Sequence, residues 1–281
     1  MIQPLLIEKI VSGSAMQNIL SVQSLTKKFD DFTAVKDISF NVEAGSIFAF
    51  LGPNGAGKST TIKMLTTVLR PTSGEISING FNALKEQDRA RASFGIVFQD
   101  HSLDDELTAY ENIVYHAVIY KVPKKERAER IRKALEIVGL WDRREDYVKK
   151  YSGGMKRRLE IARALVHYPK ILFLDEPTVG LDPQTRNAIW NHIRSLNKER
   201  GMTIFLTTHY MEEAEAIADQ IAIIDHGKII ESGTVEEIKN RTETESLEEA
   251  FLKLTGRDIR DDNVPGNKMR TIRGMRRRTR R

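Results

Sequence analysis

The sequence predicts an α/β fold with a mixed β-sheet at its core. Three short apolar runs, at 47–51, 171–174 and 203–207, are typical of strands buried in a sheet. Apolar residues at helical spacing follow the first two runs, and polar residues follow the second and third runs. The carboxyl ends of parallel strands share one edge of a sheet, so these polar residues are expected to face a common ligand.

The loop after the first run fits the phosphate-binding pattern G-x-x-x-x-G-K-[ST] without a mismatch. Its residues are Gly52, Pro53, Asn54, Gly55, Ala56, Gly57, Lys58, Ser59 and Thr60. Glycines let successive backbone N–H groups turn inward around phosphate oxygens, and the helix N-terminus adds its positive end. Lys58 is expected to reach the β- and γ-phosphates, Ser59 to ligate Mg²⁺, and Thr60 to supply a further donor.

Three more candidate residues follow the other apolar runs. Asp175 and Glu176 come directly after 171–174, where Asp175 is expected to meet Mg²⁺ through its water shell and Glu176 to deprotonate an attacking water. An acidic helix cap is the alternative. His209 follows 203–207, where a neutral imidazole is placed to contact a γ-phosphate, although a lone histidine is more often structural.

Weaker signals lie elsewhere. Phe29, in the charged turn 27–31, suits either stacking on a purine or covering the sheet edge. Ser152, Gly153 and Gly154 open a helix and form a second anion-binding nest. Gln99 ends an apolar strand, a position where a lone glutamine is usually only a turn residue.

The remaining pattern predicts one main domain with two extensions. Strands are expected at 19–25, 34–42, 75–80 and 93–99, with a hairpin at 221–230. Helical spacing over 107–147 indicates an inserted helical subdomain. We predict a flexible extension at 1–17, a main domain at 18–256 and a basic, disordered tail at 257–281.

Composition limits the remaining options. The 281 residues include no cysteine, which excludes disulfides and thiolate metal sites and suits a reducing compartment. No apolar run approaches the roughly 18 residues of a membrane-spanning helix, so a transport role would be played from the membrane surface through a partner. Net charge is +5, and eight basic residues after Pro265 contribute +8, leaving −3 for the rest. The tail is therefore either a solvated extension or a contact for anionic lipid or nucleic acid.

Taken together, these motifs resemble the ATP-binding subunit of an ABC transporter, over roughly 19–256. The order of the motifs carries the resemblance, which is closest to the daunorubicin-resistance type of drug-export ATPase. The signature at 151–155 departs from the commonest form, because Tyr151 replaces Leu and Met155 replaces Gln. Leu159–Arg163, Thr207–Ala214 and Leu247–Arg257 are similar to that type as well.

The resemblance implies a P-loop NTPase of the ABC cassette type, with a helical subdomain at about 103–165. It assigns Gln99 to the metal and to catalysis, Phe29 to adenine, and Asp182 to a dimer-contacting loop. Lys58, Glu176 and His209 complete the expected catalytic set. The implied ligands are ATP and Mg²⁺.

The resemblance also implies an assembly. Two copies, expected to form a homodimer, would enclose two ATP molecules, each phosphate loop facing the partner's Ser152–Gly154. Separate transmembrane permease subunits would complete an exporter for a drug, antibiotic or lipid-like substrate. The chain is then cytoplasmic, peripheral on the inner face of the cell membrane.

One rival function is a soluble ATPase of the same cassette type that acts on nucleic acid or ribosomes. Chromosome-maintenance cassettes would carry a long coiled coil between the phosphate loop and the signature, and ribosome-associated ones usually carry two cassettes. Neither feature is present, so we expect no nucleic-acid partner.

Overall fold

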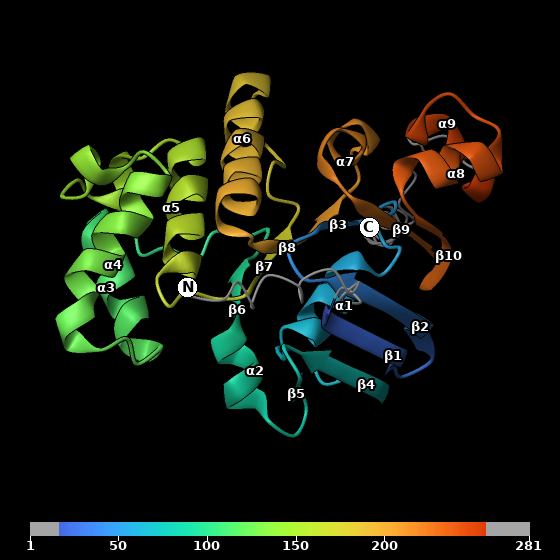
Figure 1. Ribbon diagram of the computed structural model, residues 1–281, viewed down its shortest axis with the longest axis horizontal. Helices are drawn as coiled ribbons and strands as arrows, with labels where there is room; N and C mark the ends of the chain where they lie inside the picture. Colours follow the sequence, from blue (N-terminus) through green and yellow to red (C-terminus); the bar gives the residue numbers. More distant parts are fainter. Residues whose placement is uncertain (1–16, 257–281) are drawn as a thin grey trace, which may run out of the picture.

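The structure is a computed structural model that describes residues 17–256. Two β-sheets form its centre, and a group of helices forms one end (Figure 1). The predicted basic tail and all but the last residue of the predicted N-terminal extension lie outside the described residues. The division into a domain at 18–256 with a helical subdomain at about 103–165 stays a prediction.

The larger sheet has six strands in the order β10-β9-β3-β8-β7-β6. Its members are β3 Ile47–Leu51, β6 Phe94–Val97, β7 Ile171–Asp175, β8 Thr203–Thr208, β9 Gln220–Asp225 and β10 Lys228–Gly233. All neighbours pair in parallel except β9 and β10, which form the predicted hairpin at one edge. Every residue of β3, β7 and β8 is buried, as expected for strands that are covered on both faces.

The smaller sheet is antiparallel, in the order β2-β1-β4-β5. Its strands are β1 Asn18–Phe29, β2 Phe32–Glu43, β4 Ser73–Ile78 and β5 Phe81–Asn82. The prediction of a turn at 27–31 was too long, because Lys27 and Lys28 pair with β2 and Phe29 pairs with Phe32. The turn is reduced to Asp30 and Asp31, and Asp30 adopts a φ of 44°.

Helices cover the larger sheet and build the helical end. The helices are α1 Lys58–Leu65, α2 Gln87–Ser93, α3 Ala109–Ile119, α4 Lys124–Ile137, α5 Gly153–Leu165, α6 Pro183–Arg200, α7 Met211–Ile217, α8 Val235–Thr242 and α9 Leu247–Thr255, with short 3-10 turns at Trp141–Arg143 and Val148–Lys150. In Figure 1, α3, α4 and α5 lie together at the left. In the sequence, apolar residues recur at helical spacing after the glycine loop at Ile62, Leu65 and Val68, which predicts a helix that reaches Val68. The structure differs, because α1 ends at Leu65 and Val68 is exposed.

Two apolar clusters lie on opposite faces of the larger sheet. Alternate residues of β3 enter them: Ala49 joins the cluster beneath α3–α9, and Phe48 and Phe50 join the one that contains α1 and the smaller sheet. Within the second cluster, the rings of Phe48 and Phe205 stack with their centroids 5.6 Å apart. The six-stranded sheet is therefore fixed from both sides, which holds its carboxyl edge in place.

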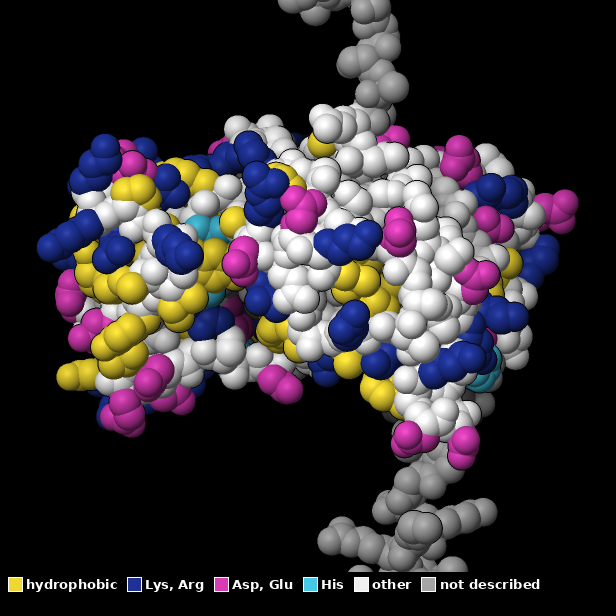
Figure 2. All heavy atoms as spheres, turned by 90° about the horizontal axis from the view of Figure 1, so that it is seen from below, with side chains coloured by type: hydrophobic (Ala, Val, Ile, Leu, Met, Phe, Trp, Pro, Cys, Tyr) yellow, Lys and Arg dark blue, Asp and Glu magenta, His cyan; other side chains and the backbone are white. Residues whose placement is uncertain are grey.

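Exposed apolar side chains gather over the helical end (Figure 2). Tyr115, Val118 and Ile119 of α3 are exposed, Ile119 to 72%. Tyr147 and Tyr168 are exposed as well. We call Tyr115, Val118 and Ile119 the α3 surface.

Candidate active site

The glycine loop joins the end of β3 to the start of α1. Gly57 caps α1 with a φ of 112°, a left-handed conformation that glycine adopts without strain. A Cβ at Gly57 would lie 2.7 Å from the carbonyl oxygen of Ala34, and a Cβ at Gly52 would lie 2.3 Å from that of Ile224. Neighbouring backbone therefore packs so closely against Gly52 and Gly57 that neither position has room for a side chain. Its N–H groups and the α1 N-terminus form a suitable cradle for phosphate.

Lys58 is buried at the first position of α1. Its Nζ donates to the carbonyl oxygens of Gly52 at 2.8 Å and Pro53 at 3.2 Å, and lies 3.2 Å from Oε1 of Glu176. Burial lowers the pKa of Lys58, while the carboxylates of Glu176 and Asp175 act in the opposite direction. The loop cation and the strand-end acids therefore share one site.

Asp175 is the last residue of β7, and Glu176 follows it with a φ of 47°. Thr207 on the neighbouring strand β8 orients both acids. Its hydroxyl donates to Oδ1 of Asp175 at 2.6 Å and accepts from the Glu176 N–H at 3.0 Å. The carbonyl oxygen of Thr207 accepts from the same N–H at 3.1 Å.

The two acids have opposite pKa shifts. Burial raises the pKa of Asp175, against hydrogen bonds from Thr207 and Ser59 that lower it. Burial also acts to raise the pKa of Glu176, but its contacts with His209 and Lys58 outweigh burial and lower that pKa. Glu176 is therefore held as a carboxylate, the form that accepts a proton.

His209 lies just beyond β8, as its position after the third apolar run predicts. Its Nδ1 is 3.2 Å from Oε2 of Glu176, and its ring packs against Tyr210 with the centroids 4.1 Å apart. Lys58, Glu176 and His209 thus form one continuous chain of contacts at the carboxyl edge of the sheet.

Gln99 and Phe29 are more exposed. Gln99 lies two residues beyond β6, the strand that pairs with β7, and its carbonyl oxygen accepts from Arg157 at 2.9 Å. Phe29 is 43% exposed, and the ammonium of Lys27 lies 4.9 Å from its ring centroid. Their roles toward metal and adenine stay predictions.

The signature residues and Asp182 lie at helix N-termini. Ser152 caps α5 by accepting from the Met155 N–H at 3.3 Å, and Asp182 caps α6 by accepting from the Thr185 N–H at 3.0 Å. A Cβ at Gly154 would lie 2.3 Å from Cγ2 of Thr185, so the two helix starts pack closely. Within the described residues, 17–256, no hydrogen bond joins the side chain of Ser152 or Asp182 to the phosphate loop.

Sequence reasoning missed two positioning residues. One is Thr207. The signal available in the sequence was the pair of threonines, Thr207 and Thr208, at a strand end. The other is Glu213 on α7, which accepts from Thr178 at 2.9 Å and from Thr208 at 3.3 Å. Glu213 therefore ties the loop that follows β7 to the end of β8.

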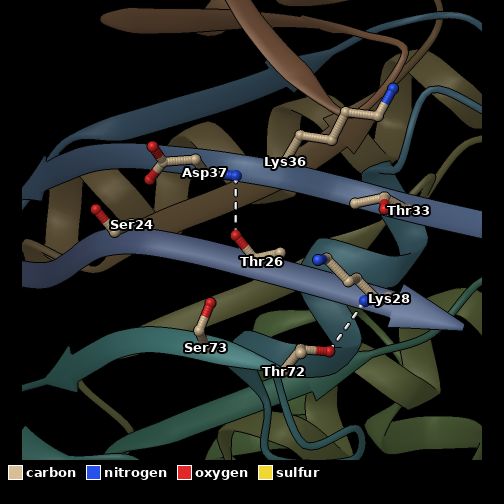
Figure 3. Close-up of a pocket in the computed structure, with 8 residues that line it drawn as sticks. All are labelled: Ser24, Thr26, Lys28, Thr33, Lys36, Asp37, Thr72 and Ser73. Atoms are coloured by element: carbon tan, nitrogen blue, oxygen red, sulfur yellow. Dashed lines mark hydrogen bonds between the residues drawn. The ribbon is translucent and has the colours of Figure 1, made fainter.

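A separate hollow of about 580 Å³ lies over β1, β2 and the start of β4 (Figure 3). Its lining residues are Ser24, Thr26, Lys28, Thr33, Lys36, Asp37, Thr72 and Ser73. It contains none of the predicted site residues and is lined by polar side chains, whereas small-molecule sites are mostly apolar. We assign no ligand to it.

The comparisons with known proteins agree with this geometry. Residues 35–179 match the family model for the ABC transporter. The chain belongs to the ABC transporter family. It is similar to the linearmycin resistance ATP-binding protein of Bacillus subtilis, with 44% identity over 79% of this chain and 71% of that protein. It is also similar to the daunorubicin/doxorubicin resistance ATP-binding protein of Streptomyces peucetius, with 43% identity over 79% and 67%.

Solved structures give the same family. An ATP-binding subunit of an ABC transporter matches with a TM-score of 0.76 and 31% identity, over 84% of this chain and 99% of that one. A dimeric ATP-binding cassette bound to ADP and Pi matches with a TM-score of 0.68 and 28% identity, over 76% and 98%.

These matches confirm the predicted cassette fold and ATPase activity. They also favour the ATP-binding subunit of an exporter over the nucleic-acid alternative. The cassette bound to ADP and Pi is dimeric, and another similar structure, cbiO1 from Clostridium perfringens, is part of the ABC transporter complex cbiONQ. No helix within residues 17–256 is long and apolar enough to cross a bilayer.

Proposed function

We propose that two copies of this chain enclose two molecules of ATP with Mg²⁺ and power the export of a drug or antibiotic. The contact chain Lys58–Glu176–His209 carries this proposal, because it joins a phosphate-binding cation to a base at one sheet edge. The names of the similar resistance proteins support the substrate class.

In this proposal, each residue at the sheet edge has one task. The loop N–H groups and Lys58 hold the phosphates, and Phe29 stacks on adenine. Ser59 and Asp175 suit Mg²⁺, which takes oxygen ligands, keeps several waters and needs only one or two carboxylates; Gln99 would join them. The ion polarises the phosphate oxygens when bound. Glu176 accepts a proton from the attacking water, and His209 orients Glu176.

The second copy supplies what one chain lacks. Ser152, Gly153 and Gly154 form an anion-binding N-terminus on α5, within the helical end and apart from the phosphate loop at α1 (Figure 1). We infer that this N-terminus faces the γ-phosphate held by the partner copy. Asp182, at the start of α6, then lies at the same interface.

Membrane-spanning permease subunits complete the exporter in this proposal, which places the chain at the cytoplasmic face of the membrane. The α3 surface supports a docking role for the helical end, because exposed apolar side chains gathered on one face mark interaction sites. Movement of the helical end would then pass to the permease.

Glu176→Gln tests the base. We expect this variant to bind ATP as the unmodified chain does, to lose hydrolysis by at least about a hundredfold, and to accumulate as an ATP-bound dimer. Size-exclusion chromatography with ATP and a phosphate-release assay measure both effects. Glu212→Gln, an exposed carboxylate-to-amide change on α7, is the matched control. Hydrolysis near the normal rate in Glu176→Gln would remove Glu176 from the role of base.

A cellular experiment tests export. Host cells that lack the chain should become more sensitive to at least one drug of a panel that includes daunorubicin. The normal gene and Glu212→Gln should restore tolerance, and Glu176→Gln should not. If cells that lack the chain tolerate every drug of the panel as normal cells do, although the chain itself hydrolyses ATP normally, the result counts against drug export.

A further inference from the structure

Two oppositely charged residues of α5 form a buried pair. They lie outside the motifs proposed to bind nucleotide. Arg157 is 2% exposed and Glu160 is 1% exposed, and Nη1 of Arg157 lies 3.0 Å from Oε2 of Glu160. Charged side chains are rarely buried this deeply unless they are paired and hydrogen-bonded. Their remaining hydrogen bonds therefore indicate what the pair holds in place.

Those hydrogen bonds go to the segment 98–102, which follows β6 and carries Gln99. Arg157 donates to the carbonyl oxygens of Phe98 at 2.6 Å and Gln99 at 2.9 Å. Glu160 accepts from the Ser102 N–H at 2.9 Å and lies 3.1 Å from Nδ1 of His101. The segment is held on both sides of Gln99, whose side chain stays exposed.

The same helix carries the signature at its other end. Ser152 caps α5 at its N-terminus, one to two turns before Arg157 and Glu160. Farther along, α5 packs closely on β6: a Cβ at Gly95 would lie 2.4 Å from the carbonyl oxygen of Ala164. The helix therefore has few ways to move relative to the strand that leads into Gln99.

We propose that Arg157 and Glu160 are positioning residues that fasten the Gln99 segment to α5, so that Gln99 and Ser152 keep a set geometry. This inference rests on the proposed function, in which Gln99 faces the nucleotide of its own copy and Ser152 that of the partner. Arg157 contacts no reacting atom and acts through Gln99. Glu160 acts through Arg157 and through the Ser102 N–H.

The test is a double-mutant cycle on the full chain with Arg157→Lys and Gln99→Ala. Arg157→Lys keeps the charge but loses the two-pronged contact with the segment. We expect it to lower kcat for ATP hydrolysis about tenfold with KM for ATP within about twofold, because the phosphate loop is untouched. In the Gln99→Ala background, the same change should cost less than about twofold further, since both changes act on one group.

Hydrogen–deuterium exchange gives a readout apart from activity. Arg157→Lys and Glu160→Gln should speed exchange at the amides of 98–102 while β6 and the rest of α5 keep their protection. Arg158→Lys is the matched control, because Arg158 lies on the same helix but donates to the Val138 carbonyl oxygen. It should change neither kcat nor exchange at 98–102.

Two results would overturn the inference. One is a full additional loss of kcat from Arg157→Lys in the Gln99→Ala background. The other is faster exchange spread over α5 as a whole, which indicates a role in stability alone. Both readouts use ATP hydrolysis or exchange by the full chain, so they remain valid if the export proposal fails.

Discussion

Thr207 shows how one residue on a neighbouring strand can orient two acids of the candidate site at once. Its hydroxyl serves as donor to Asp175 and as acceptor for the Glu176 N–H, so both acids take their orientation from it. Because Asp175 pairs with Thr207 across β7 and β8, this contact depends on sheet register. A change at Thr207 therefore acts on two neighbouring groups at once.

Thr207→Val tests this role, because valine keeps the shape and removes the hydroxyl. We expect kcat to fall about tenfold or more, since a hydrogen bond to a charged group contributes about 1.5–3 kcal/mol. The pKa of Asp175 should rise further, because the lost donor lowered it. Phosphate release measured against pH and Mg²⁺ concentration follows both effects. Thr203→Val is the control: Thr203 is buried at the other end of β8 and accepts from Gly45 N–H at 2.8 Å. Equal kcat in both variants would contradict the prediction.

Individual elements differ in how far the sequence predicts them. The bounds of β3 were predicted to the residue, because a continuous apolar run between Ser46 and the glycine loop permits few alternatives. The end of β1 was not, since Lys27 and Lys28 are polar and belong to the strand through their pairing with β2. Arg157 and Glu160 resemble an exposed helix face in sequence, and only packing against 98–102 makes them buried.

The candidate site shows the same difference. The loop glycines, Lys58, Asp175, Glu176 and His209 are adjacent to predicted strands, so topology alone brings them together. Thr207 and Glu213 act through contacts between elements; a threonine pair at a strand end was the local signal for Thr207, and no local pattern encodes the contacts of Glu213.

A group of aromatic rings joins α3 to the residues after α5. Tyr120 packs on His167 with the centroids 4.0 Å apart, and on His116 at 4.5 Å. Nε2 of His167 lies 2.9 Å from the carbonyl oxygen of Phe94. In the tautomer that carries a proton on Nε2, this nitrogen donates a hydrogen bond to that oxygen. Burial lowers the pKa of His116 to about 3 and that of His167 to about 4. Nearby arginines, Arg163 and Arg130, act in the same direction.

This group predicts a loss of stability in mild acid. Both pKa values are lower in the folded chain, so the unfolded chain binds more protons once pH falls below about 6.5. The free energy of unfolding should therefore drop from pH 6.5 to 5 by up to about 1.4 kcal/mol per pH unit for each histidine. Urea unfolding at several pH values measures the slope. His167→Gln should flatten it, and His226→Gln, at an exposed turn, should not. An equal slope in both variants would assign the acid sensitivity to other groups.

At the scale of the molecule, the larger sheet positions both the candidate active site and the segment that carries Gln99. Its carboxyl edge assembles Lys58, Glu176 and His209, and its last parallel strand, β6, leads into the segment that α5 holds. The segment held by α5 thus continues a strand that pairs with β7, and β7 ends at Asp175.

Charge is unevenly distributed along the chain. The eight basic residues after Pro265 contribute +8 to a net charge of +5, so the preceding part carries −3. An anionic membrane attracts basic segments by about 1 kcal/mol per residue near its surface, with salt screening the attraction. We therefore predict that the tail helps hold the chain at the bilayer beside its permease.

Truncation after Pro265 tests the tail. Because the proposed hydrolytic residues all precede Tyr210, ATPase activity should stay unchanged. Sedimentation with anionic liposomes at low salt should fall several-fold, since the attraction is electrostatic, while sedimentation with neutral liposomes stays as it was. A full-length variant with the eight basic residues replaced by glutamine separates charge from length, and should behave as the truncated chain does. If the truncated and complete chains sediment equally with anionic liposomes, the tail is a solvated extension; if truncation abolishes hydrolysis, the tail supports the ATPase domain directly.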